Sequence, residues 1–457
     1  MNTSQQLGEE KISSLLFKFS LPAIVAMLVN AIYNVVDRMF IGRLVGPEAF
    51  AGAFVAFPII LIVVAFGNLA GFGGASLTSI RLGQKKEEEA KMIFGNSFLL
   101  SVILAVLFTG AIFIFMEPIL RFFGSTDEIM DYSKQYMGFV ALGFPFQIIA
   151  ISLNSFMRAL GKPKLAMSTM LIGAIANIIM DALFMYVLDM GIIGAAIATS
   201  IAQVLSFTFV IQYFLSKRAP IRLERAYMVP QFFQIRKILA LGMTQFSIQL
   251  LNSLITLIYN RILAEHGGAI AISTYGIISS VLSVIVLPVF GLNQGSQPIV
   301  GYNYGAENYD RVKATLKLAI KYATIFTTLG FIVTQFFTTY LVQLFTKDPE
   351  LIDAASHGVR KFFMMFIIVG FQIVSSNYFQ AKGLPLRSFI LSISRQGLIL
   401  VPALFILSRA YGLDGIWYAA PLADAASAVF TGAVLFYDMK KMNQMEAEKL
   451  KREKIAA

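Results

Sequence analysis

Two acidic residues stand inside long apolar stretches of the first half of the chain. Asn30, Asn34 and Asp37 have the spacing of residues that share one face of a helix, and Asn177 and Asp181 share a face in the same way. Carboxylate and amide oxygens are the ligands that a hard cation prefers, and a carboxylate can also hold a proton. The spacing therefore predicts a buried site for a cation or a proton.

Further polar side chains of the first half lie within the same kind of apolar stretch: Tyr33, Tyr136, Gln147, Asn154, Thr199, Gln203 and Ser206. An ionisable residue inside a membrane span costs roughly 2.5–3.5 kcal/mol, which favours positions that face the protein interior. The alternative for Asp37 is an interfacial position beside Arg38, and for Asp181 it is a structural hydrogen-bonding role. Pro22 removes a backbone hydrogen bond from the first helix and predicts a kink there.

The composition indicates that these helices lie in lipid. Of the 457 residues, 57% are hydrophobic and 14% are charged, whereas a soluble protein carries about 25% charged residues. The absence of cysteine excludes a disulfide framework, thiolate metal sites and cysteine catalysis, and two histidines exclude a histidine-rich metal site. The first apolar run is too long for a signal peptide, so we expect it to be a retained transmembrane helix.

A membrane-spanning helix needs about 20 mostly apolar residues. Twelve such runs can be placed, and the turns between them carry breakers such as Gly83, Gly305, Pro163 and Pro385. The runs cover residues 15–40, 53–80, 93–117, 133–158, 165–188, 192–215, 236–263, 270–302, 314–340, 358–381, 387–409 and 413–438.

The lysines and arginines predict the orientation. Most of the 37 gather on one side of the spans, in short loops and in the tail at 440–454, and such an excess marks the cytoplasmic side. We therefore expect a multi-pass protein of the plasma membrane with both termini in the cytoplasm. The net charge of +11 does not indicate a nucleic-acid partner, because the charges are spread over loops and a tail rather than gathered in one patch.

The chain contains an internal repeat. One constant offset places Asn30 on Asn252, Gly46 on Gly268, Gly83 on Gly305, Lys91 on Lys313, Gly161 on Gly383 and Pro163 on Pro385. Each half holds six spans, an even number, so the halves enter the membrane the same way, as parallel repeats. The predicted fold is therefore an all-α integral membrane protein with two six-helix lobes. The predicted domains are an N-terminal lobe (1–215), a cytoplasmic linker (216–235), a C-terminal lobe (236–438) and a cytoplasmic tail (439–457).

The second half carries different polar groups. Gln249 and Asn252 belong to a neutral stripe on the seventh span, and the repeat offset places Tyr259 at the position of the first aspartate. Arg395 and Asp424 stand on consecutive spans, where we expect a structural ion pair. The alternative is that Asp424 meets cationic substrates or modulates gating. Gln249, Asn252 and Asp424 are the candidates for a substrate cleft between the lobes.

With these residues the chain resembles the multidrug and toxic compound extrusion (MATE) family, of the bacterial DNA-damage-inducible F type. The resemblance covers nearly the whole chain. It is carried by Phe19-Ser20-Leu21-Pro22, Tyr33-Asn34-Val35-Val36-Asp37, Arg158-Ala159-Leu160-Gly161-Lys162-Pro163, Asn177-Ile178-Ile179-Met180-Asp181 and Gly194-Ala195-Ala196-Ile197-Ala198-Thr199.

The resemblance implies export driven by entry of Na+ or H+, with no other cofactor. In this family the coupling site uses an aspartate of the first helix, Asn-x-x-x-Asp of the fifth and a threonine of the sixth, which match Asp37, Asn177, Asp181 and Thr199. Na+, if it is the coupling ion, would bind at these four residues. Supporting positions fit Pro22, Tyr33, Tyr136 and Asn154, with Asn34 beside them. Another bacterial branch has an acid in the seventh helix, and the nearest residue here is Asn252, so a cation site in the second lobe gains no support.

We therefore expect a secondary antiporter that exports lipophilic, cationic drugs or toxic compounds by alternating access. The alternative is a flippase for a lipid-linked saccharide on a related two-lobed fold, which predicts a strongly cationic cleft. A membrane-embedded enzyme is not expected, since the chain has no zinc motif or Ser/His/Asp set, and an ATP-driven pump would need a G-x-x-x-x-G-K-[ST] loop that it lacks. A channel would not need a buried coupling site. The expected partners are small-molecule substrates and the lipid bilayer, and we expect a monomer.

Overall fold

The computed structural model describes residues 3–45 and 47–456, except for the side chains at 3–5, 34–36, 38, 39, 42–44, 47, 48, 50, 253, 269 and 453–456. Every regular element in this part is helical. The α-helices are α1 (Thr3–Glu9), α2 (Ile12–Leu44), α3 (Pro47–Gly83), α4 (Glu87–Ile114), α5 (Met116–Phe122), α6 (Met130–Ala159), α7 (Pro163–Asp181), α8 (Gly191–Leu215), α9 (Phe232–Gly305), α10 (Tyr309–Phe336), α11 (Thr338–Gln343), α12 (Pro349–Phe362), α13 (Val369–Ala381), α14 (Pro385–Ile393) and α15 (Val401–Ala456). Two π-helical segments, η1 (Ala182–Val187) and η4 (Ser394–Leu400), and two 3-10 turns, η2 (Arg225–Tyr227) and η3 (Phe366–Ile368), complete them.

The long helices match a membrane protein with twelve passes. Ten described helices are long and apolar enough to cross a bilayer, and an eleventh span forms when α12 and the η3–α13 segment, bent by 51°, are taken together. The last of the ten, Pro385–Arg452, has 68 residues, or about 100 Å at 1.5 Å per residue, against a hydrocarbon core of about 30 Å. It contains the non-helical Gly412, so it makes two passes. Helices of this kind satisfy every backbone hydrogen bond without water.

The same turn occurs at equivalent places in the two halves. Gly161 and Gly383 have φ of +74° and +75°, a region that glycine reaches without steric cost. Pro163 and Pro385 then begin α7 and α14, because proline suits the first turn of a helix. The repeat predicted from the sequence is confirmed at this turn.

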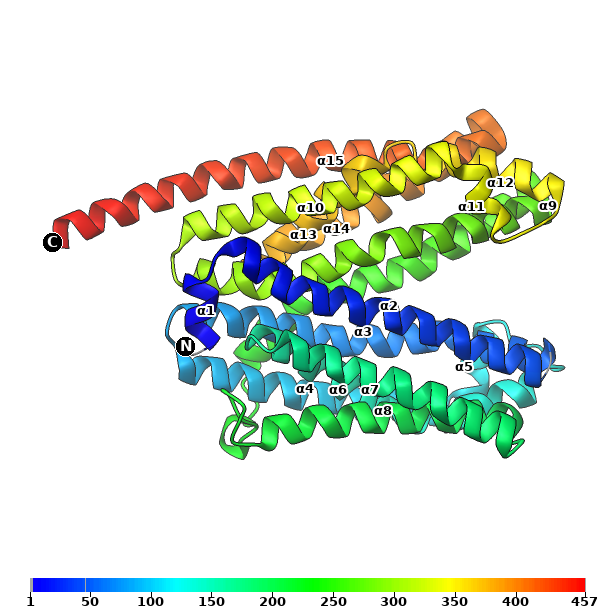
Figure 1. Ribbon diagram of the computed structural model, residues 1–457, viewed down its shortest axis with the longest axis horizontal. Coiled ribbons are helices and arrows are strands. Elements are labelled where there is room, and N and C mark those ends of the chain that lie inside the picture. The colour runs from blue at the N-terminus through cyan, green and yellow to red at the C-terminus, as the bar shows by residue number, and fades with distance from the viewer. Residues whose placement is uncertain (1–2, 46, 457) are drawn as a thin grey trace.

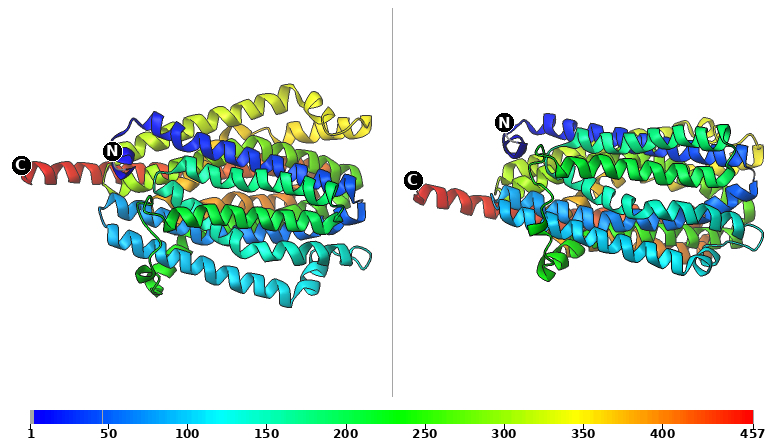
Figure 2. Two further views of the ribbon diagram at one scale, coloured as in Figure 1. Left: turned by 60° about the horizontal axis from the view of Figure 1, so that its bottom comes forward. Right: turned by 90° about the horizontal axis from the view of Figure 1, so that it is seen from below.

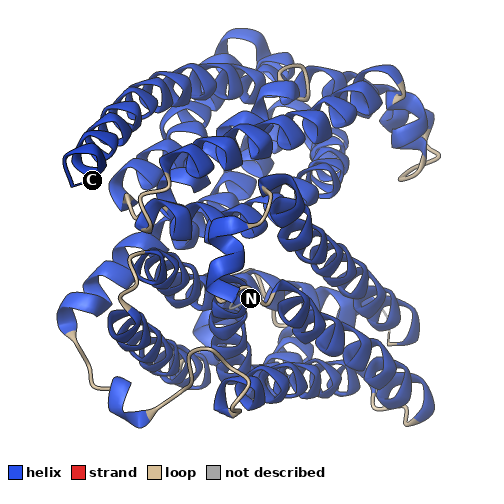
Figure 3. Cartoon of the chain, turned by 60° about the vertical axis from the view of Figure 1, so that its left-hand side comes forward, coloured by secondary structure: helices blue, strands red, loops and turns tan. Residues whose placement is uncertain are grey.

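The helices form two bundles, which Figure 1 shows one below the other and Figure 3 shows from near one end. The first bundle contains α2 to α8, and the second contains the chain from α9 onward. Each has its own apolar core, around Phe144 in the first and around Trp417 in the second. Both chain termini lie at one end of the long axis, along which the helices of both bundles run (Figure 2). We name this end the terminal end.

The two bundles touch through their backbones near the terminal end. A Cβ added at Gly83, the last residue of α3, would lie 2.0 Å from the carbonyl oxygen of Tyr302, and one added at Gly305, the last residue of α9, would lie 2.0 Å from that of Ile80. The two contacts are equivalent under the repeat, so the interface has approximate two-fold symmetry. Gly83 and Gly305, expected only as turn breakers, therefore let two helix backbones meet.

A second glycine pair extends this contact. A Cβ at Gly73 would lie 2.1 Å from the Ile238 carbonyl oxygen, and one at Gly242 would lie 1.8 Å from that of Leu69. Neither position has room for a side chain. We name Gly73, Gly83, Gly242 and Gly305 the glycine seam.

Helix α2, although part of the first bundle, also packs into the second. Near its start, Leu15 and Phe19 are buried in an apolar cluster with Val289 and Leu316 of the second bundle. Near its other end, Ile41 is buried in the core of the first bundle. Pro22 lies inside α2 between these two regions.

The segment before α2 is also held by the second bundle. The Asn303 side-chain amide donates to the Leu7 carbonyl oxygen at 2.9 Å. The Arg311 guanidinium donates to the carbonyl oxygens of Glu10 at 2.6 Å and of Leu7 at 3.2 Å. The Leu7 side chain is itself buried in the cluster that receives Leu15. The N-terminal segment is thus anchored to the lobe that comes second in the chain.

A bulky residue in the glycine seam should open the terminal end. Gly83→Val drives side-chain atoms against the Tyr302 carbonyl, and overpacking of this kind costs about 1–3 kcal/mol. Each 1.4 kcal/mol lowers the ratio of molecules with a closed seam to those with an open one by roughly a factor of 10. Ser79 is 1% exposed beside the seam, and the natural chain has no cysteine. In a Ser79→Cys background, Gly83→Val is expected to speed labelling by an impermeant maleimide added on the side of the terminal end.

Gly110→Val is the matched control, because a Cβ there meets nothing within 4 Å. It should leave the labelling rate of the introduced thiol unchanged. Equal labelling rates for Gly83→Val and Gly110→Val would show that the seam does not hold the bundles together.

Candidate cation-coupling site

Two carboxyl groups of the first lobe face each other from neighbouring helices. Asp37 lies in α2, and Asp181 is the last residue of α7, which packs along α2. The Asp181 side chain is fully buried and that of Asp37 is half-buried. The two groups lie close enough for direct electrostatic interaction. The structure therefore brings these two acids together.

Three further side chains complete the group. Tyr136 of α6 is 4% exposed and interacts electrostatically with Asp37, Asp181 and Tyr33. Its hydroxyl also pairs with Thr199 of α8. Thr199 accepts a hydrogen bond of 3.3 Å from the Asn177 side-chain amide, one turn before Asp181. Four helices thus converge on the two acids.

The acceptor oxygens of this group exceed its donors. Both carboxylate oxygens of Asp181 and the amide oxygen of Asn177 are buried and accept no hydrogen bond from described donors. A buried acceptor without a donor is costly, and two adjacent carboxylates repel each other. A hard cation or a proton relieves both penalties, since each supplies the missing positive charge. The donor set is oxygen alone, and the described residues hold no cluster of three or more His, Cys, Asp or Glu side chains that would suit a transition metal.

The backbone changes its winding directly after Asp181. The π-helical segment η1 begins at Ala182 and ends at Val187. Such wide turns are rare within helices and occur frequently at functional sites. Here the segment separates Asp181 from the turn that leads into α8, the helix that carries Thr199.

Some predicted site residues lie elsewhere. Asn154 lies about 27 Å further along α6 than Tyr136, at 1.5 Å per residue, and its side-chain amide donates to the Ala166 carbonyl oxygen at 2.7 Å. Pro22 lies near the terminal end of α2, away from Asp37. The side chain of Asn34 is outside the described part of the chain.

The polar candidates of the second lobe take part in two separate contacts. The ion pair expected between Arg395 and Asp424 is confirmed, with 2.6 Å between Nε and Oδ1. Asn252 accepts a hydrogen bond of 2.7 Å from the Gln396 side-chain amide. Gln249 lies one turn before Asn252 on the same helix and is half-buried. The second lobe thus pairs its acid with a base, unlike the first.

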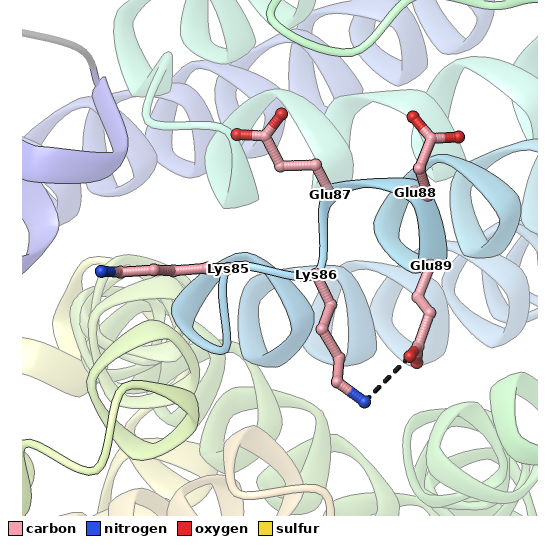
Figure 4. A pocket seen from close by; sticks show the side chains of 5 residues that line it. All are labelled: Lys85, Lys86, Glu87, Glu88 and Glu89. Atoms are coloured by element: carbon pink, nitrogen blue, oxygen red, sulfur yellow. Dashed lines mark ion pairs between the residues drawn. The ribbon is translucent and has the colours of Figure 1, made fainter.

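A surface hollow at the terminal end, drawn in Figure 4, does not belong to this group. It is formed by the turn between α3 and α4 and is lined by Lys85, Lys86, Glu87, Glu88 and Glu89. Lys86 pairs with Glu89 at 3.0 Å. Glu88 and Glu89 also pair with Lys91 and Arg81 of the flanking helices, so the hollow has the character of a charged surface loop.

The structure also shows buried polar contacts that the sequence did not predict. Arg158 is 8% exposed, and its guanidinium donates to Asn154 and Ser155, with no carboxylate at ion-pair distance among the described residues. Gln297 donates to the Ser76 hydroxyl across the lobe interface at 2.6 Å. The Gln297 contact has no sequence signal, because it joins helices that are remote in the chain, whereas the Arg158 contacts lie within one helix at a spacing of three and four residues.

The chain has extensive similarity to known transporters. The MatE family model matches it twice, over residues 22–183 and 246–406, once in each half. Multidrug export protein MepA of Staphylococcus haemolyticus (strain JCSC1435) is 27% identical over 441 residues, which are 96% of each chain. Multidrug export protein MepA of Staphylococcus aureus (strain MSSA476) is 27% identical over 418 residues, which are 92% of each chain.

Solved structures show the same fold. A MATE protein in the bent conformation superposes with a TM-score of 0.92 at 23% identity, covering 98% of this chain and 99% of that one. The MATE multidrug transporter DinF-BH in complex with rhodamine 6G superposes with a TM-score of 0.88 at 36% identity, covering 94% and 97%. The two family matches and the shared fold span both lobes. The chain therefore belongs to the MatE family of multidrug and toxic compound extrusion transporters.

Proposed function

We propose that this chain is a secondary antiporter that exports lipophilic, cationic compounds in exchange for Na+ or H+. The observation that carries the proposal is the buried Asp181 carboxylate beside Asp37, with acceptor oxygens that lack donors. Such a group gains most from a positive ion or a proton. Membership of a transporter family supports a role for that ion in transport rather than in stability alone.

The substrate class follows from the relatives and from the charge of the site. The MepA proteins are named as multidrug exporters, and DinF-BH was solved with rhodamine 6G bound. The two acids of the first lobe favour a substrate that carries positive charge, because it is attracted by the same carboxylates that the ion neutralises. Competition between ion and substrate for one charged region would couple entry of one to release of the other.

The arrangement of the lobes supports a cycle of alternating access. The glycine seam closes the interface at the terminal end, which we propose is cytoplasmic on the basis of the lysine and arginine excess. In this state the substrate leaves toward the outside. Ion binding at Asp37 and Asp181 must differ in affinity between the two states, since equal affinity would drive nothing.

Helix α2 is the element that can connect ion binding to the change in the contact between the lobes. It carries Asp37 in the first lobe, and its opposite end is buried in the second lobe. Pro22, which lacks a backbone donor, stands between them. We propose that neutralising Asp37 alters the bend of α2 at Pro22 and thereby changes the contact between lobes.

Export by the purified chain should require an ion gradient. In proteoliposomes loaded with a lipophilic cationic dye such as rhodamine 6G, a Na+ or a proton gradient imposed alone is expected to drive dye movement. The gradient that succeeds identifies the coupling ion. Dye movement at the same rate with neither gradient, together with single-channel conductance, would instead indicate a pore.

Neutralising either acid should uncouple transport. Asp181→Asn and Asp37→Asn each remove a charge that the ion requires, and loss of a charged ligand costs about 1.5–3 kcal/mol, or roughly 10- to 100-fold in ion-driven rate. The rate is measured in the same proteoliposomes at equal protein content.

Asp189→Asn is the control for this substitution. Asp189 is an exposed acid at φ +48°, a backbone region that asparagine tolerates well. Its transport rate should equal that of the natural chain. Full ion-driven export by both Asp37→Asn and Asp181→Asn would disprove the assigned coupling site.

A further inference from the structure

The guanidinium of Arg395 is used on one side only. Its Nε donates to Asp424 at 2.6 Å, and its two terminal amino groups donate no hydrogen bond to any described residue. The Arg395 side chain is 19% exposed, whereas Asp424 is 5% exposed behind it. A guanidinium held through its Nε in this way presents its two terminal amino groups for bidentate contact with an anionic oxygen.

A second donor interacts electrostatically with the Arg395–Asp424 pair. Tyr259 of α9 is 1% exposed, and its hydroxyl is buried with no hydrogen-bond partner in the described part of the chain. The phenol interacts electrostatically with both Arg395 and Asp424. Its ring is fixed by stacking on Tyr275, with 4.3 Å between centroids and 12° between planes. A buried hydroxyl without a partner is costly, so the position gains free energy when a ligand oxygen accepts from it.

Each lobe carries a π-helical segment close to its polar group, although the two segments are not at equivalent positions of the repeat. Arg395 lies within the π-helical segment η4, just as Asp181 stands directly before η1. Tyr259 occupies the repeat position of Asp37. The two polar groups thus differ in character: Asp181 and Asn177 present acceptors that lack described donors, whereas Arg395 and Tyr259 present donors that lack described acceptors.

We propose that Arg395 and Tyr259 form a subsite that binds a carboxylate oxygen of zwitterionic lipophilic substrates, whose cationic part faces the first lobe. This deepens the proposed function, on which it rests for the direction of transport. A cation bound to Asp424 is the less favourable arrangement, because it would have to displace the guanidinium from a carboxylate that is almost fully buried. An anionic oxygen needs no such displacement.

The test compares two dyes that differ only at the carboxyl group. Rhodamine 6G is an ester and a cation, and its hydrolysed free acid is a zwitterion with the same ring system. Binding of each to the full chain in nanodiscs is measured by fluorescence anisotropy. Tyr259→Phe and Arg395→Lys are each expected to raise the Kd of the free acid on the order of 10-fold, since a hydrogen bond to a charged group is lost, and to leave the Kd of the ester within about twofold.

Tyr275→Phe is the matched control, because it removes the hydroxyl of the stacked neighbour and should affect neither dye. The proposal is overturned by an unchanged Kd of the free acid in both test variants, or by equal weakening of both dyes. It is also overturned if Asp424→Asn abolishes binding of the ester, which would make Asp424 the ligand for a cation. If no ion-driven transport is observed but the variants still weaken only the free acid, the proposed antiport is disproved and the proposed subsite is not.

Discussion

Burying two carboxyl groups side by side in an apolar bundle is the constraint around which the first lobe is arranged. Water cannot solvate Asp181, and the described neighbours provide no donor for its oxygens. Tyr136 and Thr199 therefore approach from two other helices, and the π-helical turn after Asp181 re-aims the chain. A group that is balanced only when a positive charge is present is unsuited to pure structural use. It is well suited to sense an ion.

The duplication gives the two lobes one backbone plan and different chemistry. Equivalent turns at Gly161 and Gly383 have the same φ within a degree, and the lobes meet at Gly83 and Gly305 through equivalent contacts. Side chains on that common plan diverge, since Tyr259 replaces an acid and Arg395 neutralises Asp424. Backbone symmetry thus gives the lobes matching contacts, whereas the side chains give them different charges.

Much of this could be predicted from the sequence because it depends on local pattern. Apolar runs, turn residues and the repeat predicted the twelve passes and two lobes, and helical spacing brought Asn177 onto the face of Asp181. Contacts between remote segments could not be predicted. Gly83 gives the same turn signal whether or not Tyr302 lies against it. The bond from the Asn154 amide to the Ala166 carbonyl oxygen likewise joins two different helices and has no local signal.

Because α2 packs into two apolar cores, the division of the chain into halves does not coincide with the division of the structure into bundles. The covalent boundary between the halves lies in the linker before α9, but the boundary between the two apolar cores crosses α2 near Pro22. Severing the linker would consequently not release two self-contained halves. Shortening the chain at its start would strip packing from the half encoded last, because Leu7 and Leu15 fill a core made largely by that half. Helix α2 therefore ties the two bundles together.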